Sequence, residues 1–198
     1  MAGFEIISVL DSSGNPVAAR ADGGVLSVSS NGSRTTFRYT AIDITPVATA
    51  TDVLQIIGSA TKTISITSIR ITADATAATE LDFYLYKRTT ANTGGTITNP
   101  AVVKYDSLNP TQSATVNLYS ANPTALGTGV LVSASQFIVP PTAGNGGIPI
   151  MPLLFNFGLQ NNQPVILRGI TESLTISLNG QAVPAGLGLY ATIEWTEA

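Results

Sequence analysis

Short apolar runs rich in β-branched residues, each closed by a turn-forming cluster, dominate this chain of 198 residues. No apolar pattern of helical spacing is sustained over about 12 residues, whereas several runs alternate apolar and polar residues, as half-buried strands do. The length suits a single domain of about 150 residues with a further segment. The pattern therefore predicts an all-β fold, an antiparallel β-sandwich that is jelly-roll-like and carries an N-terminal extended arm.

Two runs carry this prediction in most detail. Residues 80–88 alternate cleanly, with their leucines and Phe83 on one face. In residues 62–72 the isoleucines change parity, which indicates a bulge near Thr67 and Ser68 or burial on both faces. We expect strands at 36–44, 52–58, 62–72, 80–88, 102–105, 113–119, 130–139, 153–157, 165–168, 174–178 and 187–195.

The apolar faces of these strands define the predicted core. We expect the following side chains to be mostly buried: Leu81, Phe83, Phe155, Phe157, Leu174, Ile176, Leu189, Ile193 and Trp195. Between the strands, residues 89–112 form a long polar loop, and loops of this length are usually functional or contact-forming. A tight turn is predicted at Asn179 and Gly180.

The N-terminal segment differs from the rest, so we divide the chain into an arm or leader at residues 1–35 and one sandwich domain at residues 36–198. The arm opens with a cluster of apolar side chains and continues through a turn-rich spacer. These side chains are a candidate interface, since exposed apolar clusters generally mark contact sites: Phe4, Ile6, Ile7, Val9 and Leu10. The segment can alternatively be a disordered tail or the first strand of its own domain.

Charge and composition exclude several classes of function. Only 11% of the residues are charged, and Thr and Ser together make up 43 of the 198. The net charge is −3 with nine scattered Lys and Arg, which argues against a nucleic-acid partner. No apolar run approaches the roughly 18 residues of a membrane span. The first ten residues contain no Lys or Arg, so we expect no secretion signal.

The chain contains neither histidine nor cysteine. A Ser-His-Asp triad, a thiol nucleophile and a His or Cys metal site are therefore excluded. A serine nucleophile would need a lysine as its base, and beyond the arm only Lys62, Lys87 and Lys104 are available. We expect no catalytic residues, no cofactor and no required metal.

Two weaker patterns have ordinary alternatives. Asp74, Glu80 and Asp82 flank one turn and could gather as calcium ligands or as a glycosidase pair. Their spacing fits no calcium loop and nothing marks an acid in an apolar pocket, so solvated acids near a strand end are the commoner explanation. Tyr84 and Tyr86 share the polar face of one strand and could stack on a sugar, although packing within the sheet is the commoner role.

Several turn and strand-end motifs are shared with a known group of proteins. They are Gly14–Val17, Thr45–Ala48, Thr51–Asp52, Gly58–Ile64, Tyr86–Thr96, Tyr119, Ala121–Thr124, Leu126–Gly127, Leu167–Gly169 and Glu194–Glu197. In these motifs the chain resembles small virion structural proteins of tailed bacteriophages. The resemblance implies a capsid- or tail-associated β-sandwich and carries no site residues with it.

Together these observations predict a bacteriophage virion protein made in the host cytoplasm. We expect a head decoration, or cement, protein that binds the major capsid protein as a homotrimer and that lies on the capsid surface rather than on the tail. Multivalent attachment of this kind turns weak contacts into high avidity. The alternative is a receptor- or glycan-binding module of a tail fibre or spike, which should carry a concave patch of exposed aromatic and carboxamide side chains.

Overall fold

A computed structural model of the chain describes residues 34–142, 151–159 and 162–198, together with four short strands nearer the N-terminus. The chain divides into two compact units, Met1–Arg34 and Thr35–Ala198. The first unit contains two antiparallel pairs: β1 (Val9–Leu10) with β2 (Pro16–Val17), and β3 (Arg20–Asp22) with β4 (Val25–Ser27).

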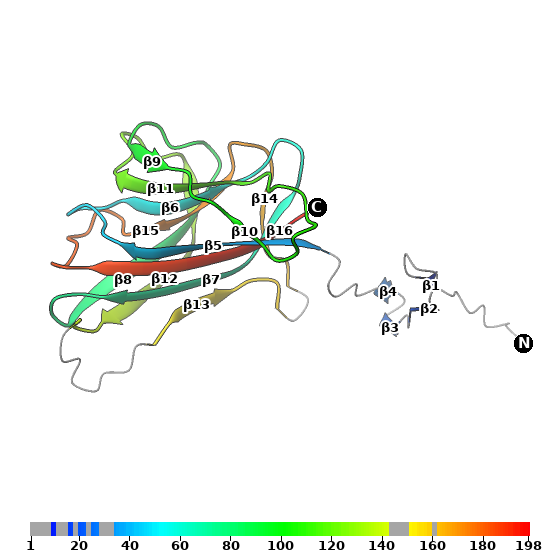
Figure 1. Ribbon diagram of the computed structural model, residues 1–198, viewed down its shortest axis with the longest axis horizontal. Helices are drawn as coiled ribbons and strands as arrows, with labels where there is room; N and C mark the ends of the chain where they lie inside the picture. The colour runs from blue at the N-terminus through cyan, green and yellow to red at the C-terminus, as the bar shows by residue number, and fades with distance from the viewer. Residues whose placement is uncertain are drawn as a thin grey trace, which may run out of the picture. The chain divides into compact units, whose positions relative to one another are not determined.

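The second unit consists of two antiparallel sheets of six strands each, packed face to face as a β-sandwich (Figure 1). Sheet I contains β5 (Thr35–Ile44), β7 (Ile64–Asp74), β10 (Val103–Lys104), β13 (Leu153–Asn156), β14 (Val165–Leu167) and β16 (Gly188–Glu197). Sheet II contains β6 (Asp52–Ile57), β8 (Thr79–Arg88), β9 (Thr96–Thr98), β11 (Thr115–Ala121), β12 (Gly129–Val139) and β15 (Ser173–Ser177). The described residues hold no α-helix, and the predicted all-β sandwich is confirmed.

The order of the strands is nested. Sheet I runs β10-β5-β16-β7-β13, with β14 also paired to β7, and sheet II runs β12-β8-β15-β6-β11-β9. Thus β5 pairs with β16, β6 with β15, β7 with β13 and β14, and β8 with β12. The C-terminal strand consequently lies between β5 and β7, in the middle of its sheet. Among the described strands of the two sheets, β9, within the predicted long loop, is one that the sequence pattern did not indicate.

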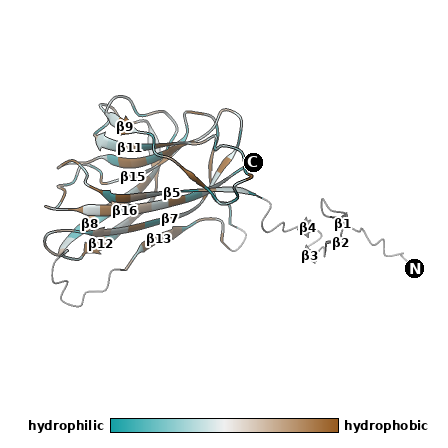
Figure 2. Ribbon diagram, in the orientation of Figure 1, coloured by the Kyte–Doolittle hydropathy of each residue, from teal (hydrophilic) through white to brown (hydrophobic). Residues whose placement is uncertain are grey.

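Apolar side chains from both sheets meet in one core, and the apolar residues concentrate along the strands (Figure 2). Trp195 is fully buried and stacks on Phe37, with ring centroids 5.9 Å apart. The predicted core is confirmed for all its members except two. Phe155 on β13 and Phe157 just after it are only half-buried, because β13 is an edge strand and this margin of sheet I is covered from one side.

The predicted bulge in the long isoleucine-rich strand is confirmed. In the pairing of β16 with β7, Glu194 lies opposite Ser68 but Trp195 lies opposite Ile66, which leaves Thr67 as the extra residue. Because the bulge adds one residue, even-numbered side chains before it and odd-numbered side chains after it point to the same face of the sheet. Ile64, Ile66, Ile69 and Ile71 are accordingly all fully buried.

Candidate functional site

The apolar cluster predicted as an interface falls almost entirely outside what the structure describes. Val9 and Leu10 form β1, in which they lie opposite Val17 and Pro16. Phe4, Ile6 and Ile7 lie outside the described residues. Their role in an interface therefore stays a prediction.

The three acids considered as calcium ligands are distributed over both sheets. Asp74 ends β7 in sheet I, whereas Glu80 and Asp82 belong to β8 in sheet II. Glu80 accepts a hydrogen bond from Gln136, and Asp82 accepts one from the Tyr84 hydroxyl. Among the residues that the structure describes, no group of three or more acidic side chains is placed to hold a metal ion.

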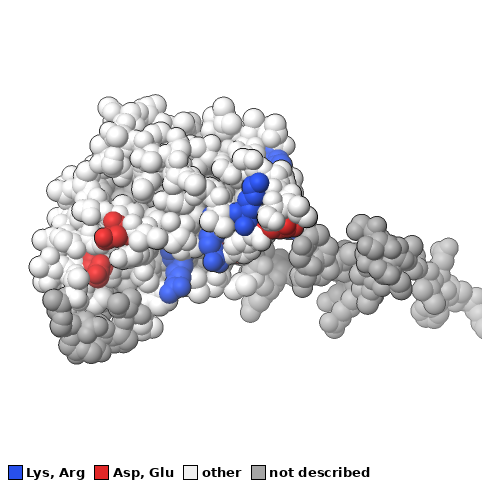
Figure 3. Space-filling model, viewed as in Figure 1, with Lys and Arg blue, Asp and Glu red and all other residues white. Residues whose placement is uncertain are grey.

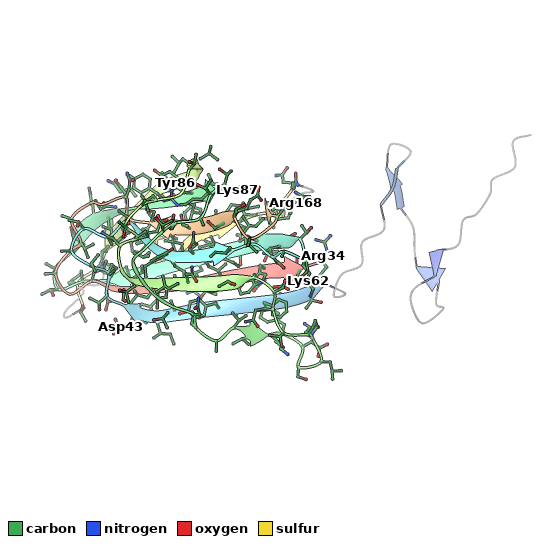
Figure 4. All side chains as sticks on the ribbon, turned by 90° about the horizontal axis from the view of Figure 1, so that it is seen from above. Arg34, Asp43, Lys62, Tyr86, Lys87 and Arg168 are labelled. Atoms are coloured by element: carbon green, nitrogen blue, oxygen red, sulfur yellow. The ribbon has the colours of Figure 1, made fainter. Side chains whose placement is uncertain are left out.

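Asp74 instead lies beside Asp43. One oxygen of each carboxylate is 2.6 Å from the point that a Cβ on Gly188 would occupy, so the two oxygens are no more than 5.2 Å apart. Asp74 also lines a hollow of about 290 Å³ together with Thr72 and Tyr190. Figure 4 places Asp43 at one end of the sandwich and Arg34, Lys62 and Arg168 toward the other.

The three lysines that could serve a serine nucleophile have structural partners. Lys62 pairs with Glu197 at 3.5 Å, and Lys87 pairs with Glu172 at 3.3 Å. Lys104 donates through Nζ to the carbonyl oxygen of Asn109 at 2.8 Å. Their ammonium groups thus face carboxylates or a main-chain carbonyl.

Tyr84 and Tyr86 stand next to each other on the outer side of β8. Their rings are nearly parallel, with centroids 6.3 Å apart and planes at 20°. The Arg88 guanidinium lies 5.3 Å from the centroid of the Tyr86 ring. Desolvation and the neighbouring Asp82 carboxylate raise the pKa of Tyr84. The Tyr86 ring is thus already engaged by the Tyr84 ring and by the Arg88 guanidinium, which is the packing role expected of such a pair.

A buried ion pair anchors the loops that cover sheet II. Arg88 donates through Nε and Nη2 to both carboxylate oxygens of Asp52, at 2.8 and 2.7 Å. Their side chains are 6% and 0% exposed. Arg88 also donates through Nη1 to the carbonyl oxygen of Gly127 at 2.7 Å. A bidentate pair in which each of the three guanidinium nitrogens has an acceptor is the arrangement that makes burying two charges tolerable.

Further side chains extend this pair into a network. Asn92 donates to Asp52 at 2.8 Å and accepts from the Gly127 N–H at 2.8 Å, which ties the start of the long loop to the turn before β12. The Tyr119 hydroxyl donates to Gln55 Oε1 at 2.9 Å, and Gln55 donates to Ser173 at 2.9 Å. A satisfied buried network of this kind favours one conformation of the loops that it joins.

Glu197 forms a second buried anchor, near the end of β16. Its side chain is completely buried and accepts hydrogen bonds from the N–H groups of Ser113 and Ala114, from the Ser113 hydroxyl and from Trp195 Nε1. Burial raises the pKa of Glu197, but these hydrogen bonds outweigh burial and hold the pKa below its ordinary value. The anchor fastens the segment before β11 to sheet I.

A long stretch of the chain carries no charge. Residues 107–167 contain no Asp, Glu, Lys or Arg, and they build β11, β12, β13 and β14. In β12, Val130, Leu131 and Ile138 are 65%, 51% and 62% exposed. On β13 and just before it, Leu154 and Met151 are also exposed. Figure 3 shows one face of the molecule, on which the Lys and Arg side chains form a single diagonal row and most of the remaining described surface is uncharged.

This stretch also forms the longest edge in the sandwich. Among the described strands, β12 pairs only with β8, so one side of its main chain has no strand partner. We call the residues of β12, Gly129–Val139, the open edge. It is the best candidate for a contact site, because it combines unpaired main-chain groups with exposed apolar side chains.

The comparisons with known proteins return no match. No protein-family model, no curated protein and no solved structure is similar to the chain. Within the described residues, no helix has the length and apolar character needed to cross a membrane. The functional conclusion therefore depends on the geometry above and on the sequence.

Proposed function

We propose that this chain is a structural protein of a tailed-bacteriophage virion, a head decoration protein that binds and stabilises the major capsid lattice. The observation that carries the proposal is the distribution of charge. The surface is poor in charge, residues 107–167 have none, and the charged residues Asp52, Arg88 and Glu197 are buried. A protein that makes broad contacts within an assembly benefits from a surface that needs little desolvation of charge.

The strand order supports a jelly roll, the finer form of the sandwich that we propose. Its eight principal strands pair first with last, second with seventh, third with sixth and fourth with fifth, when β13 and β14 are counted as one position. Such nesting is what a folded-over ribbon of antiparallel strands produces. Jelly rolls recur in viral capsid proteins, although a fold by itself does not assign a function.

The proposal includes the absence of catalysis. The partners of Lys62, Lys87 and Lys104 support it, since an activated serine would need one of these amines close to its hydroxyl. The alternative of a glycan-binding tail module gains no support from Tyr84 and Tyr86, because stacking on a sugar needs an open ring face.

Attachment to the lattice would use the apolar arm as its anchor. In the proposed arrangement Phe4, Ile6, Ile7, Val9 and Leu10 lie across a neighbouring capsid subunit, and a homotrimer presents three arms at once. Three linked attachments raise the avidity far above that of one arm. The sandwich then covers the lattice with its weakly charged surfaces.

Binding to purified undecorated heads and to purified tails of the same phage tests the proposal. We expect the full chain to bind heads at a fixed number of copies per capsid and to raise the temperature at which heads release their DNA. Deletion of residues 2–12 should leave the melting temperature of the free protein unchanged but abolish binding to heads. Binding to tails alone, or unchanged binding after the deletion, would contradict the proposal.

A further inference from the structure

The open edge is an exception among the edges of this sandwich. The other described strands at the sheet margins are β9, β10, β13 and β14, which have three, two, four and three residues. Because β10 pairs only with Phe37 and Arg38, the end of β5 is a second open stretch, shorter than β12. Short edge strands are one of the ways in which natural proteins prevent unwanted strand pairing. β12 has 11 residues and is therefore long enough to pair along its whole length.

The open edge also lacks the usual chemical protection. Natural edges carry Lys, Pro or inward-pointing charges, and β12 contains none of these residues. Its one irregularity is a shift in register against β8 between Leu131 and Ser133. From Ser133 to Val139 the pairing with β8 is regular, so seven consecutive residues offer an undistorted edge.

The chemistry of this edge restricts what can cover it. Unpaired N–H and C=O groups in a row are satisfied by an extended strand, and the exposed Val130, Leu131 and Ile138 favour a partner without charge. In every copy of the chain, the open edge itself is such a strand. An antiparallel pair of two open edges satisfies both at once, and no like charges oppose each other across it.

We propose that the open edge pairs antiparallel with the open edge of a second copy, which joins the two copies of sheet II into one continuous sheet. The inference goes beyond the proposed function and does not depend on it. The contact is two-fold, so any three-fold contact of a decoration trimer would have to use another surface. The expected species therefore contain two copies, or six where both contacts operate.

Sedimentation velocity of the full chain over a range of concentrations tests the inference. We expect an equilibrium between one copy and two or six copies, with amide exchange in Ser133–Val139 slowing as the concentration rises. Ile138→Lys adds a charge to each of the two paired edges, the device by which natural edges prevent pairing, and should weaken association by roughly tenfold to a hundredfold. Ile42→Lys is the matched control, because Ile42 is 74% exposed on β5 in the other sheet and should leave association unchanged.

Several outcomes would overturn the inference. They are a single copy at all concentrations, a species of three copies alone, and equal weakening by Ile42→Lys and Ile138→Lys. Loss of association on deleting residues 2–12, with no effect of Ile138→Lys, would instead identify the arm of a neighbour as the occupant. If Ile138→Lys fails to fold, Leu131→Lys, on the same edge and opposite Tyr86, replaces it in the comparison.

Discussion

Two regions of sheet II, the C-terminal end of β8 and the open edge of β12 beside it, differ sharply in their chemical surroundings. At the end of β8, Arg88 forms a buried ion pair with Asp52, and polar side chains bind the loops on that side. Beside it, β12 contains no charged residue, has no partner on its outer edge among the described strands, and carries exposed apolar side chains. The protein thus buries charge where the chain must be held in place and leaves it out where the surface is open.

This comparison explains how a chain with so few charges can order its long loops. A polar network contributes more inside the protein than on its surface, because the local dielectric is low and competing water is absent. A rim charge, by contrast, mainly suppresses wrong contacts. The open edge lacks charges that would prevent wrong strand pairing. This absence fits the proposed pairing with the open edge of a second copy.

The largest effect is expected from breaking the buried ion pair. Arg88→Met leaves the Asp52 carboxylate buried without its partner and should lower the free energy of unfolding by about 3–5 kcal/mol. Replacing Asp52 by Leu in the same chain should recover part of this loss, because no isolated charge then remains. Urea unfolding measures both variants, and a loss below about 1 kcal/mol for Arg88→Met would show that the pair does not hold the loops.

The sequence predicted the positions of the strands, but it did not predict the buried pair of Arg88 and Asp52. The alternation of apolar and polar residues located the strands and the bulge at Thr67. Successive side chains on a strand point to opposite faces, so a change in the alternation marks an irregularity. The partner of Arg88 could not be found in this way. Strict alternation would place Asp52 on the same face as Leu54, which is buried in the core. The pairing of β6 with β15 shifts between Leu54 and Asp52, and this irregularity turns Asp52 to the outer side of sheet II.

The sequence also could not predict how far the side chains at the sheet edges are buried. Phe155 and Phe157 have the pattern of a core strand, but their exposure depends on how many strands lie beyond β13. The uncharged stretch at 107–167 is readable directly from the sequence, whereas its placement at an unpaired edge requires the strand order. The pattern of side chains along a strand identifies its buried face. Which strands lie next to it is set by pairing between segments far apart in the sequence.

Glu197 should give the next largest effect and a dependence on pH. Glu197→Gln replaces a charged acceptor of several hydrogen bonds and should cost about 1.5–3 kcal/mol at neutral pH. Because the pKa of Glu197 is lowered in the folded state, its contribution is full above the unfolded value near 4.5 and is lost as the pH falls through the folded value. Thermal unfolding from pH 7 to pH 3 should therefore show a smaller acid loss for the variant, and identical pH profiles would contradict this.

Gly127 tests how tightly the network closes the turn before β12. A Cβ at this position would lie 1.9 Å from the main-chain oxygen of Thr90, so the backbone would have to move. We expect Gly127→Ala to cost about 1–3 kcal/mol, as overpacking does in rigid surroundings. Gly180→Ala is a useful contrast, because no atom lies within 4 Å of its Cβ position and any loss there reflects its positive φ alone.

A smaller effect is expected from the exposed charges on sheet I. Arg38 donates to Glu194 at 2.8 Å and lies over the ring of Tyr105, but its side chain is 46% exposed. Solvent-exposed pairs contribute about 0–1 kcal/mol, so Arg38→Ala should barely change the urea midpoint. If Arg38→Ala lowered the free energy of unfolding as much as Arg88→Met, burial would not explain the different contributions of the two arginines.

The smallest effect on folding is expected at the open edge itself, at Leu131. This side chain is half-exposed opposite Tyr86, so Leu131→Gln should change the free energy of unfolding of a single copy by no more than about 0.5 kcal/mol. At high concentration the same substitution should lower the melting temperature relative to the unsubstituted chain, because a contact between copies stabilises the folded state by mass action. Scanning the melting temperature against concentration for both proteins separates the two contributions. Equal curves at every concentration would place Leu131 outside any contact, and a loss at low concentration would make it part of the fold.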